Sequence, residues 1–395
     1  MTASAPAAPI RVGVIGAGMA GQAHAFGYRN AMMAVDSEIN VELVAIADPN
    51  LPLAETVARR YGFAEAVSDV DAFIARDDID VISVALPNFL HAEVLPKVIA
   101  SGKHLFAEKP IGTTPEESAR LQALAEASPA VTGVGFSFRR LPGLAAVAQA
   151  VAEGRLGKVH TVRGSYFADY AADAAGALSW RYSQQQSGGG AILDIGAHAI
   201  DALHFVAGPI ASVLDATLRT VIAERPLPSR GAIGHGASTS TETGPVTNDD
   251  TALLTVEFAS GATGHIALSR IATGTPNSLT VEVVGTRGSA SFDSIASGEF
   301  HIFENGVADE AYNGPRRVFT GPAHPYFTDV AAMPGAGVGT GYAEAFTAEI
   351  QEFLRRVNSG TPMDTDFATA TQMMNVVGAA LEASATGTAT RVATA

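Results

Sequence analysis

The sequence contains no cysteine, which excludes disulfide bonds and thiolate metal sites. No apolar run approaches the roughly 18 residues that a membrane-spanning helix needs, and Met1–Pro9 lacks the basic segment that opens a secretory signal. Positive charge is scarce, because 25 lysines and arginines stand against 40 acids, a formal net charge of −15. This balance disfavours nucleic acids and anionic membranes as partners, since both attract basic surfaces. We expect a cytoplasmic protein with neither kind of partner.

The residues that are present are typical of a globular protein with two domains. The chain has 395 residues, 47% hydrophobic and 16% charged, enough to bury two cores. Up to about residue 135, short β-branched strands alternate with helical patterns, which predicts a doubly wound parallel sheet over residues 1–135. Later strands are joined by turns at Ser260-Gly261 and Gly285–Gly288, which predicts an α+β domain with an open, mainly antiparallel sheet over residues 136–395.

Two long stretches of the second domain lack any periodicity. Glu224–Asn248 and Gly306–Gly341 are rich in Gly, Pro, Ser, Thr and Ala, and loops of such length are typically active-site covers or mobile segments. They are followed by an apolar stripe that includes Phe346, Ile350 and Phe353. Its spacing predicts a helix docked on a core.

The segment Gly16–Gly21 reads G-x-G-x-x-G between a predicted strand and a helix. Such a turn lets the backbone approach a diphosphate, which the N-terminus of the helix attracts. The pattern indicates a dinucleotide site with contacts from Gly16, Gly18, Met19 and Ala20; the alternative is a glycine turn without a ligand. Asp48 ends the second strand and can bind the adenosine ribose, or simply cap a turn. Its charge would repel a 2′-phosphate, so NAD is expected rather than NADP.

Two later strands also end in polar residues. Pro87 and Asn88 follow the strand 81–85, with His91 one turn later. Because carboxyl ends of parallel strands face the ligand crevice, we expect all three to contact the cofactor; Asn88 as a plain helix cap and His91 as a bystander are the alternatives. The strand 103–107 leads into Glu108-Lys109-Pro110. This delivers Lys109 towards the cofactor, unless it forms only an exposed ion pair with Glu108.

A glycine triplet, Gly188–Gly190, opens a predicted helix in the second domain. Asp194, His198 and Asp201 have the spacing i, i+4, i+7, so they are expected on one helical face. Histidine is the natural base for a hydroxyl proton, while a lysine can stabilise an alkoxide and an aspartate can orient the histidine. The alternative is a helix-start acid with a surface histidine. No metal is expected, since a third ligand is missing.

Together the Gly16-Ala17-Gly18 turn, the Glu108-Lys109-Pro110 motif and the Gly-Gly-Gly…Asp194-x-x-x-His198 segment resemble the Gfo/Idh/MocA oxidoreductases. The resemblance implies a Rossmann domain joined to a domain whose open sheet packs into homodimers or homotetramers. It also implies Lys109, Asp194 and His198 as catalytic residues that contact substrate. Ser179-Trp180-Arg181 resembles the Trp-Arg pair of inositol and levoglucosan dehydrogenase-like members. That likeness places Trp180 and Arg181 at the cofactor, and Arg181 also at the substrate.

The resemblance implies NAD-dependent hydride transfer at a sugar or cyclitol hydroxyl carbon. The alternative is an NAD-dependent glycoside hydrolase, which oxidises the sugar transiently, eliminates, adds water and reduces again. Arginines at 139, 140, 163 and 181 would suit an anionic sugar such as a sulfoquinovoside, because guanidinium groups match sulfonate and carboxylate. Arg139 and Arg163 are therefore candidate substrate contacts. Pairing of Arg139 and Arg140 with local acids is the competing interpretation.

Overall fold

The computed structural model describes residues 8–35, 39–228, 236–306, 311 and 313–394. Contacts divide the chain into two compact units. Unit 1 comprises Met1–Gly112, Glu116–Leu141 and Gly321–Thr371, and unit 2 comprises Thr113–Pro115, Pro142–Thr320 and Gln372–Ala395. The domain boundary at residues 135 and 136 stays a prediction. Residues 321–371, which the sequence analysis placed in the second domain, pack within unit 1.

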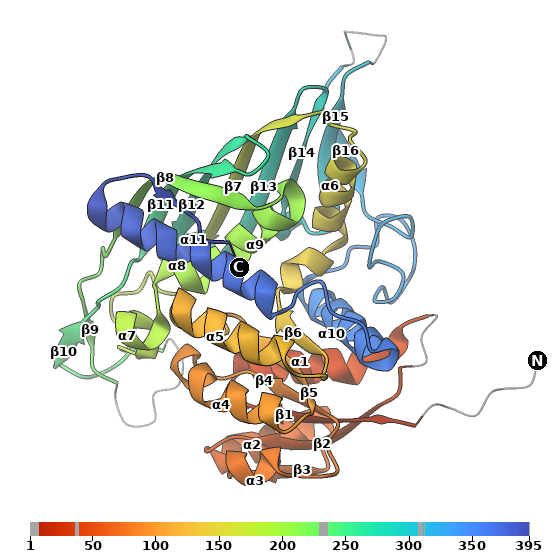
Figure 1. Ribbon diagram of the computed structural model, residues 1–395, viewed down its shortest axis with the longest axis vertical. Coiled ribbons are helices and arrows are strands. Elements are labelled where there is room, and N and C mark those ends of the chain that lie inside the picture. The colour runs from red at the N-terminus through yellow and green to blue at the C-terminus, as the bar shows by residue number, and fades with distance from the viewer. Residues whose placement is uncertain (1–7, 36–38, 229–235, 307–310, 312, 395) are drawn as a thin grey trace, which may run out of the picture. The chain divides into compact units, whose positions relative to one another are not determined.

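Unit 1 is built on a six-stranded parallel sheet in the order β3-β2-β1-β4-β5-β6 (Figure 1). Its strands are β1 (Ile10–Ile15), β2 (Val41–Ala47), β3 (Glu65–Val67), β4 (Val81–Val84), β5 (His104–Glu108) and β6 (Thr132–Gly135). The chain order reverses beside β1, which pairs with both β2 and β4. In sheets of this kind a ligand crevice opens at that reversal, outside the carboxyl ends of the strands.

Helices of unit 1 follow the predicted alternation. They are α1 (Met19–Asn30), η1 (Ala31–Met33), α2 (Leu51–Tyr61), α3 (Val70–Ile74), α4 (Asn88–Ala100), α5 (Pro115–Glu126), η2 (Ser137–Arg140) and α10 (Tyr342–Ser359). The predicted stripe on α10 is confirmed, since Ile350 and Phe353 are fully buried in the same core as Tyr28. At Gly27 of α1 an added Cβ would lie 2.8 Å from Ile350, so the glycine allows α10 to approach α1 closely.

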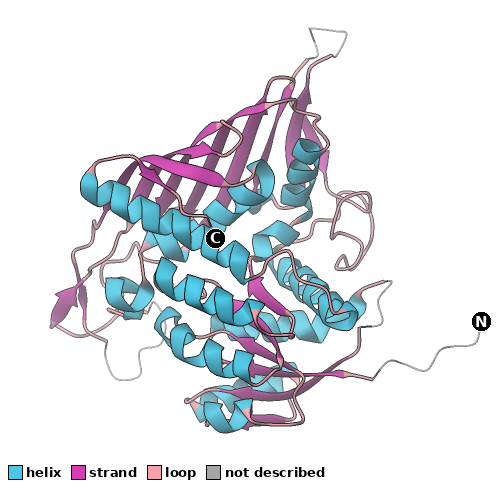
Figure 2. Ribbon diagram, in the orientation of Figure 1, coloured by secondary structure: helices cyan, strands magenta, loops and turns pink. Residues whose placement is uncertain are grey.

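Unit 2 contains a nine-stranded sheet in the order β16-β15-β14-β13-β7-β12-β11-β8-β17. Figure 2 draws strands in magenta and helices in cyan. Its strands are β7 (Val159–Ala168), β8 (Ile210–Arg219), β11 (Thr251–Phe258), β12 (Thr263–Ser269), β13 (Asn277–Gly285), β14 (Gly288–Asp293), β15 (Glu299–Glu304), β16 (Arg316–Phe319) and β17 (Thr390–Arg391). All neighbours are antiparallel except β7 and β12. Both predicted hairpins, β11–β12 and β13–β14, are present, and the predicted fold class is confirmed.

One face of this sheet is covered by α6 (Pro142–Ala152) and α9 (Gly196–Ala207), which pack on β7 and β13–β15. Close packing is visible at Gly164 of β7, where an added Cβ would lie 2.9 Å from Leu203 of α9. Residues on the other face, such as Leu253, are exposed, so β11 alternates between buried and exposed positions. The predicted open face is therefore present.

Several elements of the chain were not predicted from the sequence. Three short strands, β9 (Glu224–Pro226), β10 (Thr243–Pro245) and β16, lie within the stretches predicted to be loops. Residues 229–235, 307–310 and 312 of those stretches lie outside the described residues. The helix α11 (Phe367–Thr386) was also missed, because its alanines and glycine blur the apolar stripe.

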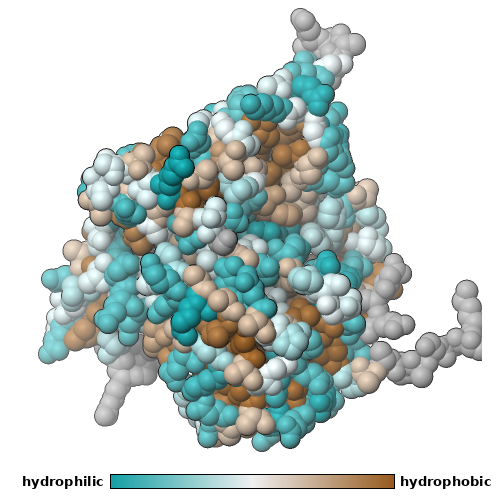
Figure 3. All heavy atoms as spheres, viewed as in Figure 1, coloured by the Kyte–Doolittle hydropathy of each residue, from teal (hydrophilic) through white to brown (hydrophobic). Residues whose placement is uncertain are grey.

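The described residues include no single helix long and apolar enough to cross a membrane. The bent pair Gln184–Asp194 and Gly196–Ala207 passes a test of length and composition, as core helices of globular proteins also do. Most of the second of these helices is buried within unit 2. Figure 3 shows hydrophilic and hydrophobic residues interspersed over the face it draws.

Candidate functional site

The glycine turn of unit 1 has the geometry that a diphosphate requires. Gly16 has a φ of +102°, and an added Cβ there would lie 2.2 Å from the Ala85 carbonyl oxygen. By contrast, apart from Gly18 itself and its two chain neighbours, no described atom lies within 4 Å of the Cβ position of Gly18, so space is open there. Gly18 precedes α1 and has no side chain to cap the first amides of this helix. Those amides and the helix dipole fit an anion, so the chain's own residues fit a dinucleotide.

Asp48 lies at the carboxyl end of β2 and braces the glycine turn. One carboxylate oxygen accepts a hydrogen bond from the Ala17 amide and the other from the Asn50 amide, each at 2.8 Å. The turn-capping interpretation is therefore confirmed. A carboxylate can accept about four hydrogen bonds, so the predicted ribose contact is compatible with this role and stays a prediction.

Glu108 is buried at the end of β5 and belongs to a hydrogen-bonded network. Its Oε1 lies 3.0 Å from Nε2 of His24, whose Nδ1 lies 2.7 Å from the Ser83 hydroxyl. Its Oε2 accepts from the Lys109 amide at 3.1 Å. Burial alone would raise the pKa of Glu108, but the hydrogen bond and charge of His24, then the charge of Lys109, hold it below the ordinary value. An ionised Glu108 therefore fixes the backbone at Lys109.

The sequence analysis missed two members of this network, His24 and Ser83. His24 is fully buried and follows the glycine turn within α1. The available signal was its place one turn into that helix. The predicted alternative of an exposed Glu108–Lys109 ion pair is wrong, because Glu108 is only 9% exposed.

His91 supports the turn that follows Lys109. It is fully buried in the first turn of α4, and its Nδ1 lies 2.6 Å from the Pro110 carbonyl oxygen. Burial lowers the pKa of His91, although the hydrogen bond to Pro110 opposes this, so the neutral ring donates through Nδ1–H. Pro87 is the N-cap residue of α4 and Asn88 its first residue, and the N-cap makes no side-chain hydrogen bond. Cofactor contacts from Pro87, Asn88 and His91 stay predictions.

In unit 2 the predicted helix of the acid and the histidine is broken. The short helix α8 (Ala191–Asp194) ends at Asp194, and α9 begins at Gly196. The segments on either side of Ile195 are bent by 46°. The expectation that Asp194, His198 and Asp201 share one helical face is therefore wrong. Gly196 is a weak helix former, and its missing Cβ gives room to Leu268, which would lie 2.8 Å from that atom.

Asp194 and His198 occupy the two sides of this break. The Tyr170 hydroxyl donates to Oδ2 of Asp194 at 2.5 Å. Burial and the neighbouring carboxylate raise the pKa of Tyr170 well above its ordinary value, so the phenol is a neutral donor. His198 is 8% exposed, and its ring centroid lies 6.2 Å from that of Tyr166. The alternative of a surface histidine is therefore wrong. The sequence analysis missed Tyr170, which carries no motif.

The Trp180-Arg181 pair lies in η3 (Trp180–Tyr182) of unit 2. The Arg181 guanidinium carbon lies 4.4 Å from the centroid of the Trp180 ring. The Arg181 carbonyl accepts from Asn248 Nδ2 at 2.8 Å and from Arg270 Nη1 at 3.2 Å. These two hydrogen bonds fix the backbone at Arg181. The side chains of Trp180 and Arg181 are half-buried, so the guanidinium group stays accessible to a ligand.

Arg140, a further arginine that would suit an anionic sugar, is paired with an acid. Arg140 pairs with Asp364 and donates to the Tyr326 hydroxyl at 2.7 Å, all within unit 1. Burial raises the pKa of Asp364, but the hydrogen bond and charge of Arg140, followed by the charge of buried Arg139, hold it below the ordinary value. The interpretation that Arg140 pairs with a local acid is thus confirmed.

Arg163 lies on β7, where it pairs with Glu282 at 2.8 Å and remains 51% exposed. Alternate residues of β7 are buried against α9, as at Gly164. Arg163 therefore faces the open side of the sheet, opposite the side on which Tyr166 lies near His198. The structure does not bring Arg163 together with Asp194 and His198.

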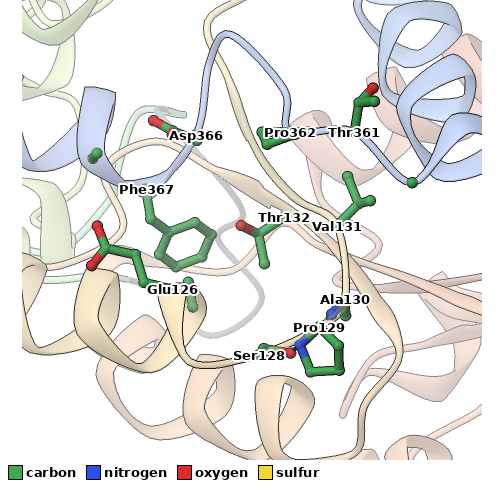
Figure 4. A pocket seen from close by; sticks show the side chains of 13 residues that line it. Glu126, Ser128, Pro129, Ala130, Val131, Thr132, Thr361, Pro362, Asp366 and Phe367 are labelled. Atoms are coloured by element: carbon green, nitrogen blue, oxygen red, sulfur yellow. Dashed lines mark hydrogen bonds between the residues drawn. The ribbon is translucent and has the colours of Figure 1, made fainter.

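A cavity of about 260 Å³ lies elsewhere in unit 1 (Figure 4). It is bordered by Glu126 of α5, by Val131 and Thr132 at the start of β6, and by Pro362 and Phe367. This is the amino end of β6, whereas the glycine turn and Lys109 lie at carboxyl ends. The cavity therefore does not belong to the predicted cofactor site. Within the described part of the chain no group of three or more acids and histidines could hold a metal ion.

Family models match the sequence of both the N-terminal and the C-terminal part of the chain. Residues 10–136 match the oxidoreductase family with an NAD-binding Rossmann fold, and residues 144–291 match the GFO/IDH/MocA C-terminal domain. The chain is 36% identical to levoglucosan dehydrogenase of Pseudarthrobacter phenanthrenivorans over 95% of this chain and 96% of the relative. It is 27% identical to inositol 2-dehydrogenase of Rhizobium meliloti, with 89% of each chain covered.

Solved structures of levoglucosan dehydrogenase have the same fold as this chain. A levoglucosan dehydrogenase in complex with NADH has a TM-score of 0.91 and 33% identity, covering 98% of this chain and all of that one. Levoglucosan dehydrogenase has also been solved with NADH and levoglucosan, with a TM-score of 0.90 over the same coverage. With its glycine turn and open sheet, the chain belongs to the GFO/IDH/MocA oxidoreductases and carries their NAD-binding Rossmann domain.

Proposed function

We propose that this oxidoreductase is an NAD-dependent dehydrogenase that moves a hydride between the hydroxyl-bearing carbon of a sugar or cyclitol and nicotinamide. The observation that carries the proposal is the Asp194 carboxylate, which accepts from Tyr170 at 2.5 Å and lies four residues before the buried His198. An acid and an imidazole held in this way suit removal of a hydroxyl proton. The likeness to levoglucosan dehydrogenase and inositol 2-dehydrogenase supports this substrate class.

Each catalytic residue has one role in the proposed reaction. Bound NAD⁺ supplies the hydride acceptor. The imidazole of His198 takes the hydroxyl proton while the C–H bond breaks and its electron pair leaves with the hydride, which converts the alcohol to a ketone. Asp194, which accepts a hydrogen bond from Tyr170, stabilises the charged form of His198 through its negative charge. The Lys109 ammonium stabilises the developing alkoxide, since charge-assisted hydrogen bonds are stronger than neutral ones.

Further contacts are proposed from the position of each residue in its unit. At the cofactor we propose Gly16, Gly18, Met19, Ala20, Asp48, Pro87, Asn88, His91, Glu108, Lys109, Trp180 and Arg181. Glu108 acts through the backbone of Lys109, which it holds at 3.1 Å. At the substrate we propose Arg139 and Arg181 beside the catalytic residues, and leave out Arg163 because it faces the open side of the sheet.

The redox-neutral alternative, cleavage of an anionic glycoside, keeps only part of the support that the four arginines gave it. Arg140 is committed to Asp364 and Arg163 to Glu282. Two of the four arginines that would suit an anionic sugar are therefore neutralised by acids. An NADH assay distinguishes this alternative from the dehydrogenase.

We also propose that the chain assembles into homodimers or homotetramers through the open face of the nine-stranded sheet. Leu253 on this face is 58% exposed, and the Arg163–Glu282 pair lies on the same face. Self-association would bury both. Light scattering of the wild type and of Leu253→Asp measures this: the proposal expects an oligomer that Leu253→Asp weakens, and a monomeric wild type would contradict it.

The test of the enzymatic function has two stages. Sugars, sugar acids, sulfonated sugars and cyclitols are first screened by thermal shift with NAD present, because specific ligands stabilise the folded state. Each compound that stabilises the protein is then followed by NADH absorbance. Net NADH formation from a free sugar or cyclitol supports the dehydrogenase. Glycoside cleavage that requires NAD without accumulating NADH would replace it with the alternative.

A further inference from the structure

A buried acid far along the chain caps the helix that ends at Asp194. Asp249 is 5% exposed and lies just before β11. Its Oδ1 accepts from the Gly190 amide and its Oδ2 from the Ile192 amide, each at 2.8 Å. Its backbone carbonyl accepts from the Ala191 amide, also at 2.8 Å. One residue therefore satisfies three successive amides at the start of α8, which usually depend on a neighbouring side chain or water.

Gly190 makes this contact possible. A Cβ at position 190 would lie 1.8 Å from the Asp249 carbonyl oxygen, a distance that no side chain tolerates. A glycine lets another segment approach the backbone closely, and at position 190 that segment belongs to the chain itself. Gly190 and Asp249 lie 59 residues apart along the chain and form one tertiary contact.

The two residues beside Asp249, Asn248 and Asp250, fix η3, which carries Arg181. Asn248 donates to the Arg181 carbonyl at 2.8 Å and to the Ser187 hydroxyl at 2.8 Å. Asp250 accepts from Nε of Arg270 at 2.9 Å, and Arg270 also donates to the Arg181 carbonyl at 3.2 Å.

These polar side chains are enclosed in the core of unit 2. Asn248, Asp250 and Arg270 are at most 4% exposed. Buried polar networks of this kind specify one geometry, because breaking any bond leaves an unsatisfied group. The segment 248–250 therefore ties η3, which carries Arg181, to α8, which carries Asp194.

We propose that Asp249 is a positioning residue for catalysis, which sets α8 so that Asp194 meets Tyr170 and α9 presents His198. A cap needed only for stability would be replaceable without a specific kinetic effect. Here the capped helix is a single turn that ends at the proposed catalytic acid, so a shift of its first amides reaches Asp194 directly. The kinetic part of this inference rests on the proposed function.

The experiment changes each partner of the contact between Gly190 and Asp249 in turn, in the full chain. Asp249→Asn keeps the shape but replaces one acceptor oxygen with a donor, which leaves one amide of α8 without an acceptor. Gly190→Ala inserts a methyl group against the Asp249 backbone. Both variants are expected to lower kcat at least tenfold, with KM changed less than threefold and NADH affinity within twofold of wild type. In the double variant the losses are expected not to multiply, since both changes break one contact.

Asp293→Asn is the matched control, because Asp293 caps η4 (Ser294–Ala296) by accepting from the Ile295 amide at 2.9 Å, also within unit 2. It is expected to keep kcat within twofold. Folded Asp249→Asn with wild-type kcat would overturn the inference. Should that variant fail to fold, Gly190→Ala decides by the same criterion.

Amide hydrogen exchange separates failure of this inference from failure of the proposed function. Exchange at residues 190–192 is expected to be at least tenfold faster in Asp249→Asn than in wild type, whichever substrate the enzyme uses. If the wild type reduces no NAD with any compound of the screen, the proposed function fails and exchange alone decides the capping role. Unchanged exchange at these amides would reject that role.

Discussion

The lysine of unit 1 is held by Glu108 of its own strand and, through it, by His24 of α1, whereas the acid of unit 2 is held by residues from distant loops. Glu108 fixes the Lys109 backbone and is itself bound by His24. Asp194 depends on Tyr170, and its helix depends on Asp249. A parallel sheet brings all carboxyl ends to one edge, so its topology assembles the first group. An antiparallel sheet has no such common edge, so tertiary contacts must assemble the second.

The largest effect is expected at the lysine itself. Lys109→Ala should lower kcat by roughly 10²–10⁴-fold, the usual range when a group that stabilises transition-state charge or transfers a proton is removed. NADH affinity, measured by fluorescence titration, should fall far less than kcat, because Lys109 is one of several proposed cofactor contacts and the glycine turn is untouched. Lys103→Ala, on the turn before β5, is the control and should keep wild-type turnover. Comparable turnover in Lys109→Ala would remove the lysine from the reaction.

A smaller effect is expected at the hydroxyl that holds Asp194. Tyr170→Phe should lower kcat about tenfold and move the acidic limb of its pH profile to higher pH, because a hydrogen bond to a carboxylate favours the ionised form. The control is Tyr166→Phe, which loses a bond of 2.6 Å to Asn277 instead. If the two variants have the same kinetics and pH profile, Tyr170 has only a structural role.

A third change affects cofactor choice more than rate. Asp48→Ala removes the charge that would repel a 2′-phosphate, so the ratio of kcat/KM for NAD to that for NADP should fall about tenfold. Steady-state kinetics with both cofactors provide the measurement. Because Asp48 also accepts from the Ala17 and Asn50 amides, circular dichroism must first show an intact fold. An unchanged ratio in a folded variant would place the ribose contact elsewhere.

The smallest expected effect is on the pH dependence of the unfolding free energy, and it has opposite signs at Glu108 of unit 1 and Asp249 of unit 2. The folded-state pKa of Glu108 lies below its ordinary value of 4.5, so its stabilising contribution is present above that pH and is lost as pH falls through the folded value. Asp249 behaves oppositely. Burial raises its pKa, although the Ile192 and Gly190 amides oppose this, so its contribution favours the fold at low pH and is lost as pH rises.

Urea unfolding of Glu108→Gln and Asp249→Asn between pH 3 and 7 measures both slopes. Unfolding free energy should fall less steeply on acidification in Glu108→Gln than in wild type, and more steeply in Asp249→Asn. Identical slopes in all three proteins would show that neither carboxylate changes its pKa on folding.

The sequence predicted the parts whose signals are local. The glycine turn, the strand ends at Asp48 and Lys109 and the hairpins of unit 2 depend on a few consecutive residues, and these elements are present. The continuous helix from Asp194 to Asp201 failed because periodicity does not register the tertiary packing of Leu268 against Gly196. Tyr170 and Asp249 lie 24 and 55 residues from Asp194 along the chain, so no spacing rule connects them to it. Arg163 was misplaced because a strand presents alternate residues to opposite faces.

The central claim is net hydride transfer from a sugar or cyclitol carbon to NAD, and isotopic labelling tests it most directly. A substrate found in the screen, deuterated at the carbon that is oxidised, is incubated with wild-type protein and NAD⁺, and both products are examined by mass spectrometry. For net hydride transfer we expect one deuterium in the reduced cofactor and a ketone that has lost it. Deuterium retained in a cleaved sugar, with no labelled NADH accumulating, would contradict it.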